Sequence, residues 1–287
     1  MTLNPEAVEH EAVPRYVQKT VSGKKGFYDS LTNQFIPEEV FELARQKARD
    51  AGRLLVERQS RVFRSLRYGM TFEAATGPAD SFLRAHLYHK VPMVMLYADI
   101  VGSTNMSLTV PVDTLSAIIQ VFFQETSITI TEHGGYVLKY AGDSVLAFFP
   151  LIGSDSSKQQ DAEVAKEAVS CASEIITVIR QVINPILNEY YYPELAVRIG
   201  VDAGLCAVVL YGSDKKASYV DILGPCISLA AKMKSLGRPD SVVAGQAVNE
   251  WLGDGNSSLA PLKVEIEKWN YVNDSTGAIY RLYQASQ

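Results

Sequence analysis

Two aspartates lie at positions where a charged carboxylate is energetically unfavourable unless it binds a cation or reaches solvent. Asp99 closes the apolar run VPMVMLYADI, and Asp143 lies in the turn of KYAGDSVLAF. A carboxylate after an apolar strand must leave the core or find a cation. Taken singly, Asp99 is explained as a helix cap and Asp143 as a turn residue. Taken together, two close carboxylates predict a cation between them, and ligands that are all oxygen favour Mg²⁺ or Mn²⁺ shared with a substrate phosphate.

The residues after Asp99 suit an anion. Gly102 lets a ligand approach the backbone closely, and Ser103 and Thr104 can begin a helix. The N–H groups at a helix start point toward a bound phosphate. We therefore expect a phosphate-binding turn beside the predicted metal site.

The elements that position these residues alternate between strand and helix from residue 91 onward. The order β-α-β-β-α-β is the ferredoxin-like arrangement of an α+β protein, with an antiparallel-rich sheet and helices on one face. Its first strand and its hairpin lie side by side, which brings Asp99 and Asp143 to one edge. The predicted elements are a strand at 91–100, a helix at 113–132, a hairpin at 136–150, a helix at 156–187, two strands within 194–212, a helix at 224–235 and a strand at 241–245.

The region before residue 91 has a different character. The first 35 or so residues show no clear period and predict an irregular arm. Pro37, Glu38 and Glu39 then begin a long amphipathic helix that reaches about residue 66. We expect its basic face to be solvated, with a dimer, regulatory or membrane-surface contact as the alternatives. That face carries Arg45, Lys47, Arg49, Arg53, Arg58, Arg61, Arg64 and Arg67.

Composition narrows the class of protein. The 287 residues are 47% hydrophobic and 21% charged, with a net charge of −5. This balance argues against a general nucleic-acid binder and against a disordered chain. No stretch approaches the ~18 apolar residues that cross a bilayer, and the N-terminus lacks the order of a signal peptide, so we expect a cytoplasmic protein. Three cysteines that lie far apart in the sequence, Cys171, Cys206 and Cys226, exclude a disulfide framework and a CxxC metal site.

The net charge of the chain changes from basic to acidic near Lys90. We place the boundary between regions 1–90 and 91–287 there.

Four segments together resemble the class III nucleotidyl cyclase catalytic domain over about residues 90–285. They are YADIVGSTNMS, HGGYVLKYAGDSVLAFF, VRIGVDAG and YVDILGPCISLAAKMKS. The resemblance implies two Mg²⁺ or Mn²⁺ ions per site, held by Asp99, Asp143 and the carbonyl of Ile100. It also implies a homodimer, in which one subunit supplies these ligands and the other the base- and phosphate-contacting residues.

The same resemblance assigns the second set. Lys139 falls where the family has a purine-reading lysine, and Asp221 where its acidic partner accepts from an adenine amino group. The reaction implied is attack of the ribose 3′-hydroxyl on the α-phosphorus, with release of pyrophosphate. A late phosphate-binding lysine of the family corresponds to Lys263 or Lys268.

Two positions depart from the family. Ser228 replaces the usual Asn, and Lys232 the usual Arg, although their spacing of four keeps both on one helix face. Lysine lacks the two-pronged geometry of arginine. Three outcomes stay open: a slow enzyme, a shifted geometry, or loss of cyclisation. ATP is the favoured substrate. The alternatives are a pyrimidine cyclase of a bacterial antiphage system, a catalytically weak nucleotide-binding regulatory module, and a scaffold built on residues 37–66.

Overall fold

The computed structural model describes residues 16–21, 24–29, 34–69, 74–151, 158–212, 218–253, 258–273 and 276–285. The chain divides into two compact units, Met1–Glu57 and Arg58–Gln287. The second unit therefore begins well before the boundary predicted near Lys90. Two buried residues ahead of Lys90 show why: Val62 and Leu83 are each 1% exposed.

The first unit contains a small antiparallel sheet where we predicted an irregular arm. Its strands are β1 (Tyr16–Val21), β2 (Lys24–Asp29) and β3 (Gln34–Pro37), so the prediction was wrong for these residues, and residues 1–15 lie outside the described part. Gly26 explains the tight pairing, because a Cβ there would lie 2.3 Å from the Ile36 carbonyl oxygen. The predicted long helix is confirmed as α1 (Glu38–Tyr68), with Glu38 and Glu39 in its first turn.

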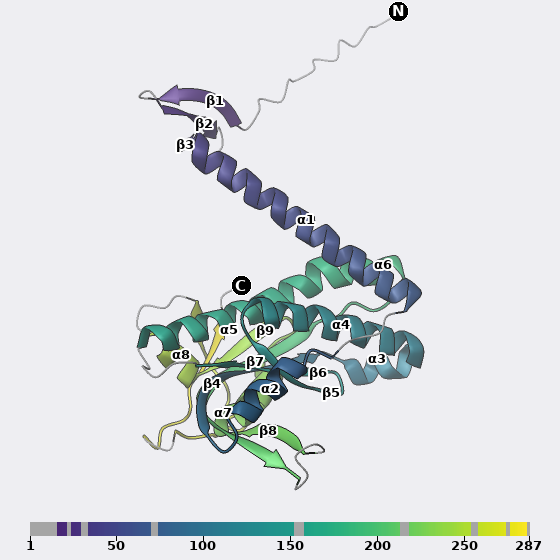
Figure 1. The fold of residues 1–287 in the computed structure, drawn as a ribbon, viewed down its shortest axis with the longest axis vertical. Coiled ribbons are helices and arrows are strands. Elements are labelled where there is room, and N and C mark those ends of the chain that lie inside the picture. The colour runs from purple at the N-terminus through teal and green to yellow at the C-terminus, as the bar shows by residue number, and fades with distance from the viewer. Residues whose placement is uncertain are drawn as a thin grey trace, which may run out of the picture. The chain divides into compact units, whose positions relative to one another are not determined.

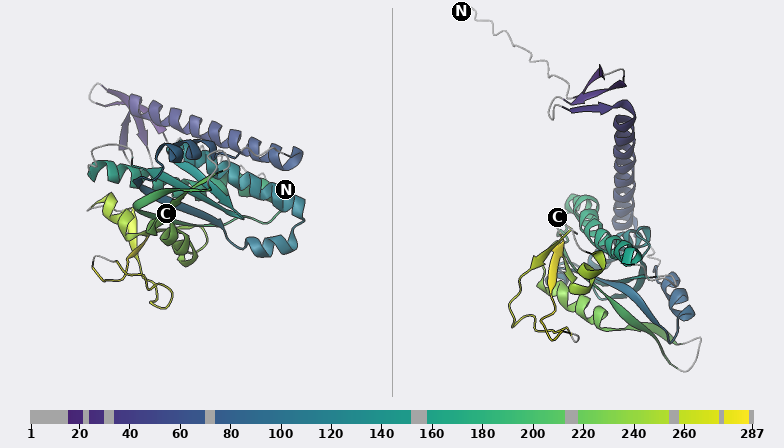
Figure 2. Two further views of the ribbon diagram at one scale, coloured as in Figure 1. Left: turned by 60° about the horizontal axis from the view of Figure 1, so that its bottom comes forward. Right: turned by 90° about the vertical axis from the view of Figure 1, so that its left-hand side faces the viewer.

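The second unit is built on one sheet with the predicted βαββαβ core (Figure 1). Within the described residues the main path runs β10-β11-β9-β7-β4-β6-β5, and β8 pairs with β7. The sub-order β7-β4-β6-β5 is antiparallel throughout and matches the ferredoxin-like prediction. Figure 2 shows the yellow C-terminal strands at one end of this sheet. The strands are β4 (Lys90–Ile100), β5 (Tyr136–Ala141), β6 (Ser144–Pro150), β7 (Val197–Tyr211), β8 (Tyr219–Leu223), β9 (Ser241–Gly245), β10 (Leu259–Leu262) and β11 (Leu282–Ala285).

Helices cover both faces of the sheet, not one face as predicted. Alternate residues of β4, including Met93 and Met95, pack on α2 and α7, while α4 and α5 contact the sheet from the other side (Figure 1). Both β4 faces are apolar, which is why a second layer of helices can be buried. The helical segments are α2 (Gly77–Ala85), α3 (Ser103–Thr109), α4 (Val112–Glu132), α5 (Lys158–Val178), the π-helical η1 (Ile179–Ile183), α6 (Asn184–Glu189), α7 (Pro225–Met233), the 3₁₀ turn η2 (Lys234–Leu236) and α8 (Gln246–Leu252).

Strand β7 is one strand of 15 residues where we predicted two. It pairs with β4 without interruption from Ala207, opposite Lys90, to Val197, opposite Ile100. The segment Asp202-Ala203-Gly204 resembles a turn by residue type. Inside the sheet, however, the backbone groups of this segment are satisfied by β4, so the strand continues.

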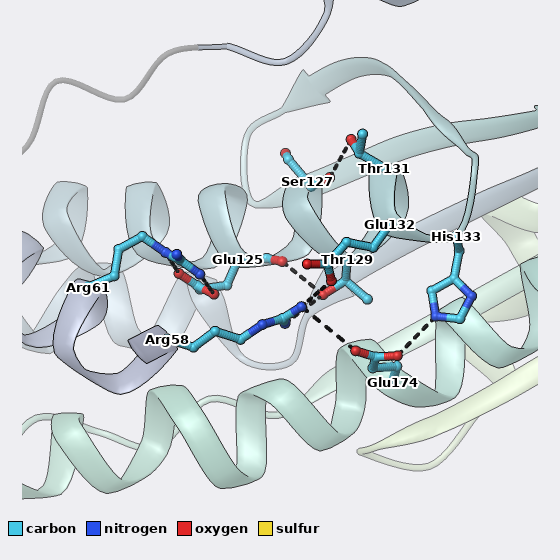
Figure 3. A network of polar contacts seen from close by, with 9 residues as sticks. All are labelled: Arg58, Arg61, Glu125, Ser127, Thr129, Thr131, Glu132, His133 and Glu174. Atoms are coloured by element: carbon cyan, nitrogen blue, oxygen red, sulfur yellow. Dashed lines mark hydrogen bonds and ion pairs between the residues drawn. The ribbon is translucent and has the colours of Figure 1, made fainter. Parts of the chain in front are cut away.

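The basic face of α1 is only partly solvated. Arg58 is 3% exposed, donates to the Thr129 hydroxyl at 3.1 Å and pairs with Glu132. Arg61 binds Glu125 through two hydrogen bonds of 2.7 and 3.0 Å. For these two arginines the prediction of a solvated face was wrong, because acids on α4 and α5 meet them (Figure 3). The network also contains Glu174 and His133.

The described helices include none that is long and apolar enough to cross a membrane. The three cysteines are buried and free.

Candidate active site

The two predicted metal-binding aspartates meet at the end of β4 and the start of β6. Ser144 Oγ donates to Asp99 Oδ1 and lies 3.4 Å from Asp143 Oδ1. One hydroxyl therefore lies between the two carboxylates and donates to Asp99. The position follows from register, because Asp99 pairs with Ser144 across β4 and β6, and Asp143 occupies the tight turn that Gly142 forms with a φ of 65°.

The turn after β4 is tied to the second aspartate. Ser103 Oγ donates to Asp143 Oδ2, so this hydroxyl contacts the acid that we predicted it would neighbour. Gly102 precedes α3 in the left-handed conformation, with a φ of 72°. The Ile100 N–H faces the Asp143 carbonyl at 3.4 Å. Gly102 and Thr104 are exposed, which leaves the surface of this turn accessible.

Lys139 and Asp221 pair with each other although they are distant in sequence. Lys139 Nζ lies 2.6 Å from Asp221 Oδ2, and their side chains are 31% and 14% exposed. The second oxygen of Asp221 accepts from the Ile222 N–H at 2.9 Å. Partial burial works to lower the pKa of Lys139, but the hydrogen bond and charge of Asp221, with a smaller effect of Tyr219, raise it overall. The ammonium is therefore a fixed donor beside a fixed acceptor.

Helix α7 carries Ser228 and Lys232 on its exposed face. Within the described residues neither side chain has a polar partner. The opposite face is buried through Cys226, Ala230 and Met233. The helix lies close to β7 because position 200 is glycine: a Cβ there would lie 2.0 Å from the Ala230 carbonyl oxygen.

Lys234 was not predicted, yet it contacts the candidate metal site. Its Nζ lies 2.6 Å from Asp99 Oδ1 and 4.4 Å from the centre of the Tyr97 ring. The unpredicted Ser144 completes the set. The motif LAAKMKS held the signal for Lys234, since a second lysine two residues after Lys232 points to the other side of a helix.

The two alternatives for a late phosphate lysine are separate from this cluster. Lys268 pairs with Glu265 at 2.6 Å, and both side chains are largely exposed. Lys263 lies in a groove that Val264, Trp269 and Tyr280 also line. Neither lysine has a described contact with Asp99 or Asp143, so this prediction stays a prediction.

The donor set fits a hard divalent ion. The candidate ligands are two carboxylates and a backbone carbonyl, all oxygen, as Mg²⁺ and Mn²⁺ prefer. Across the described ranges no cluster of three or more His, Cys, Asp and Glu residues is present that could hold a metal by itself. Substrate oxygens and water would have to complete the coordination shell, which suits an ion that Mg²⁺-type sites share with a phosphate.

Comparison with known proteins points in the same direction. The family model for the adenylate and guanylate cyclase catalytic domain matches residues 85–268. A cytidylate cyclase of Escherichia coli is 28% identical over 172 residues, which cover 56% of this chain and 35% of that protein. A uridylate cyclase of Burkholderia cepacia is 27% identical over 178 residues, covering 60% of this chain and 73% of that protein. The match thus spans little more than a third of the cytidylate cyclase.

A solved structure agrees on the fold. The adenylyl cyclase CyaB from P. aeruginosa superposes with a TM-score of 0.58 at 19% identity, covering 69% of this chain and 95% of that one. At this identity the likeness concerns the fold alone.

Proposed function

This chain belongs to the adenylate and guanylate cyclase catalytic domain family, and we propose that it converts a nucleoside triphosphate into its 3′,5′-cyclic monophosphate and pyrophosphate. In this reaction the ribose 3′-oxygen forms a bond to the α-phosphorus and loses its proton. The bond between the α-phosphorus and the bridging oxygen breaks, and pyrophosphate leaves with the electron pair. The observation that carries the proposal is the pair Asp99 and Asp143, joined by Ser144.

Different residues of the chain would contact the metal ion, the phosphates and the ribose. Asp99, Asp143 and the Ile100 carbonyl would hold Mg²⁺ or Mn²⁺, which supplies a lowered pKa for the ribose hydroxyl and neutralises phosphate charge. The backbone of the turn at 102–104 would contact phosphate oxygens. Ser228 and Lys232 would donate to the ribose and the reacting phosphate. Both are exposed on α7, which supports their use by a second copy in a homodimer.

For the base, we propose one with an amino group at C4 of a pyrimidine or C6 of a purine. Lys139 offers a donor and Asp221 an acceptor, 2.6 Å apart. Cytosine and adenine both present an amino donor beside a ring-nitrogen acceptor, whereas thymine-like and guanine edges present a carbonyl acceptor at the amino position. CTP is the leading candidate because a cytidylate cyclase is among the most similar relatives. ATP is the second candidate, since the Lys139–Asp221 pair matches adenine equally well.

The first test is product formation by the full chain. Purified protein is incubated with Mn²⁺ and with ATP, GTP, CTP or UTP separately, and products are identified by mass. We expect a cyclic nucleotide from CTP or ATP, and no product from Asp99→Asn or Asp143→Asn. Asp113→Asn, an exposed acid at the start of α4, is the matched control and should retain activity. Absence of product from all four nucleotides would refute cyclisation and favour the regulatory module.

The second test addresses the base. Asp221→Asn keeps the shape but places an amide donor beside Lys139, which suits a carbonyl at the amino position. We expect kcat/KM for CTP or ATP to fall by about 100-fold or more, and the preference to move toward UTP or GTP. An unchanged ratio among the four nucleotides would show that Asp221 does not contact the base.

A further inference from the structure

The ion pair between Lys234 and Asp99 places a protein cation on the carboxylate that we assign to metal binding. Lys234 Nζ lies 2.6 Å from Asp99 Oδ1, the same oxygen that accepts from Ser144. The pair is largely shielded from water, because the two side chains are 19% and 22% exposed. A carboxylate oxygen that already binds a hydroxyl and an ammonium has little capacity left for another cation.

A second cation adds to the effect. Arg198 lies directly opposite Asp99 in the β4–β7 register, so its side chain leaves the same face of the sheet. Its Nε is buried, and in the described part of the chain it has no hydrogen-bond partner. Two carboxylates and two cations therefore share this end of β4, and the local charge is close to balanced. A divalent ion approaching such a site is attracted far less than by two free carboxylates.

Lys234 contacts a neighbouring aromatic ring as well as Asp99. It lies on η2, a single 3₁₀ turn after α7, at the end of a long, flexible side chain. In the position that pairs with Asp99, its Nζ also lies 4.4 Å from the centre of the Tyr97 ring, which is a cation–π contact. Tyr97 precedes Asp99 by two residues on the same strand face, so an ammonium released from Asp99 has this ring beside it.

We propose that Lys234 competes with the divalent metal ion for Asp99, so that binding of the ion and release of Lys234 are coupled. This inference rests on the proposed metal site. It makes Lys234 a residue that sets metal affinity, separate from the substrate-contacting Lys232. The released ammonium remains near the site, where the charge of a triphosphate would hold it away from Asp99.

The experiment measures Mn²⁺ binding to the full chain without nucleotide, by the loss of the free Mn²⁺ signal in electron paramagnetic resonance. Lys234→Gln removes the competing charge but keeps most of the side chain. We expect it to bind Mn²⁺ about 5- to 30-fold more tightly than the unaltered chain, as for loss of a partly buried ion pair. Lys234→Arg keeps the charge and should not tighten binding.

Lys166→Gln makes the same charge change on the exposed face of α5 and should bind Mn²⁺ within twofold of the unaltered chain. Asp99→Asn should abolish the binding in both the Lys234 and the Lys234→Gln backgrounds. Thermal unfolding checks that each variant is folded. Equal or weaker Mn²⁺ binding by Lys234→Gln, or tighter binding that Asp99→Asn does not remove, would overturn the proposal. Neither result depends on product formation, so cyclisation can fail or succeed independently.

Discussion

A buried acid on β7, Asp202, gives a prediction about pH. Asp202 on β7 is 1% exposed and accepts a hydrogen bond from the Tyr280 hydroxyl at 2.8 Å through Oδ1. Within the described residues its Oδ2 is buried without a partner. Burial raises the pKa of Asp202 to about 7, against the smaller lowering effects of Tyr280 and the Ala203 N–H. The neutral form is therefore favoured by folding.

The sign follows from linkage. An acid whose pKa is higher in the folded chain contributes stability below the unfolded pKa of about 3.9, and this contribution is lost as pH rises through about 7. Between pH 5 and pH 8 the loss from Asp202 amounts to about 2–3 kcal/mol. For a unit of this size we expect a fall in Tm of about 5–10 °C.

The perturbation is Asp202→Asn, which resembles the neutral acid and cannot titrate. The Tm of the variant minus that of the unaltered chain should rise from pH 5 to pH 8, and at pH 8 the variant should have the higher Tm. His133 also has a raised pKa: burial lowers it, but its hydrogen bonds to the carboxylates of Glu174 and Glu167 outweigh that effect. The contribution of His133 to stability is also lost as pH rises. The comparison therefore uses the difference in Tm between the variant and the unaltered chain at each pH. A difference in Tm that stays constant from pH 5 to pH 8 would refute the reasoning.

Two further changes test how the catalytic unit is held together. Arg61→Met leaves Glu125, whose side chain is 1% exposed, as a buried unpaired carboxylate, and should cost about 3–5 kcal/mol in urea unfolding. Arg64→Met on the exposed side of α1 is its control and should cost little. Gly200→Ala forces a Cβ against the Ala230 carbonyl and should lower unfolding free energy by about 1–3 kcal/mol while reducing cyclase activity, because α7 must shift. An active protein with unchanged Tm would show that α7 adapts without loss.

Periodicity predicted the parts of the fold that local signals determine. The helices α1 and α4 and the hairpin β5–β6 follow from spacing and from the Ala-Gly-Asp turn. The β-α-β-β-α-β order then predicted which strands pair in the sheet. This pairing in turn predicted that Asp99 lies close to Asp143. Register decides which side chains share a face, and register was implied once the hairpin was recognised.

Contacts between residues that are far apart in the sequence determine the features that sequence patterns did not predict. Asp202 and Gly204 resemble a turn, but β4 supplies their backbone partners, and β7 runs on through them. Arg58 resembles a solvated charge on the basic face of α1, until acids from α4 and α5 come near. In both cases the deciding groups lie far away in sequence, where no local pattern reports them.

The segment Lys232-Met233-Lys234 places two neighbouring lysines in different environments. On a helix, residues two apart differ in direction by about 200°, so two lysines flanking a buried methionine cannot face the same way. Lys232 is exposed, Met233 is fully buried, and Lys234 reaches Asp99. Counting charges along the sequence would assign both lysines to one basic surface. Their angular positions around the helix axis place them on different sides. These positions leave Lys232 exposed, where the homodimer that we propose would use it, and hold Lys234 against Asp99 of the same chain.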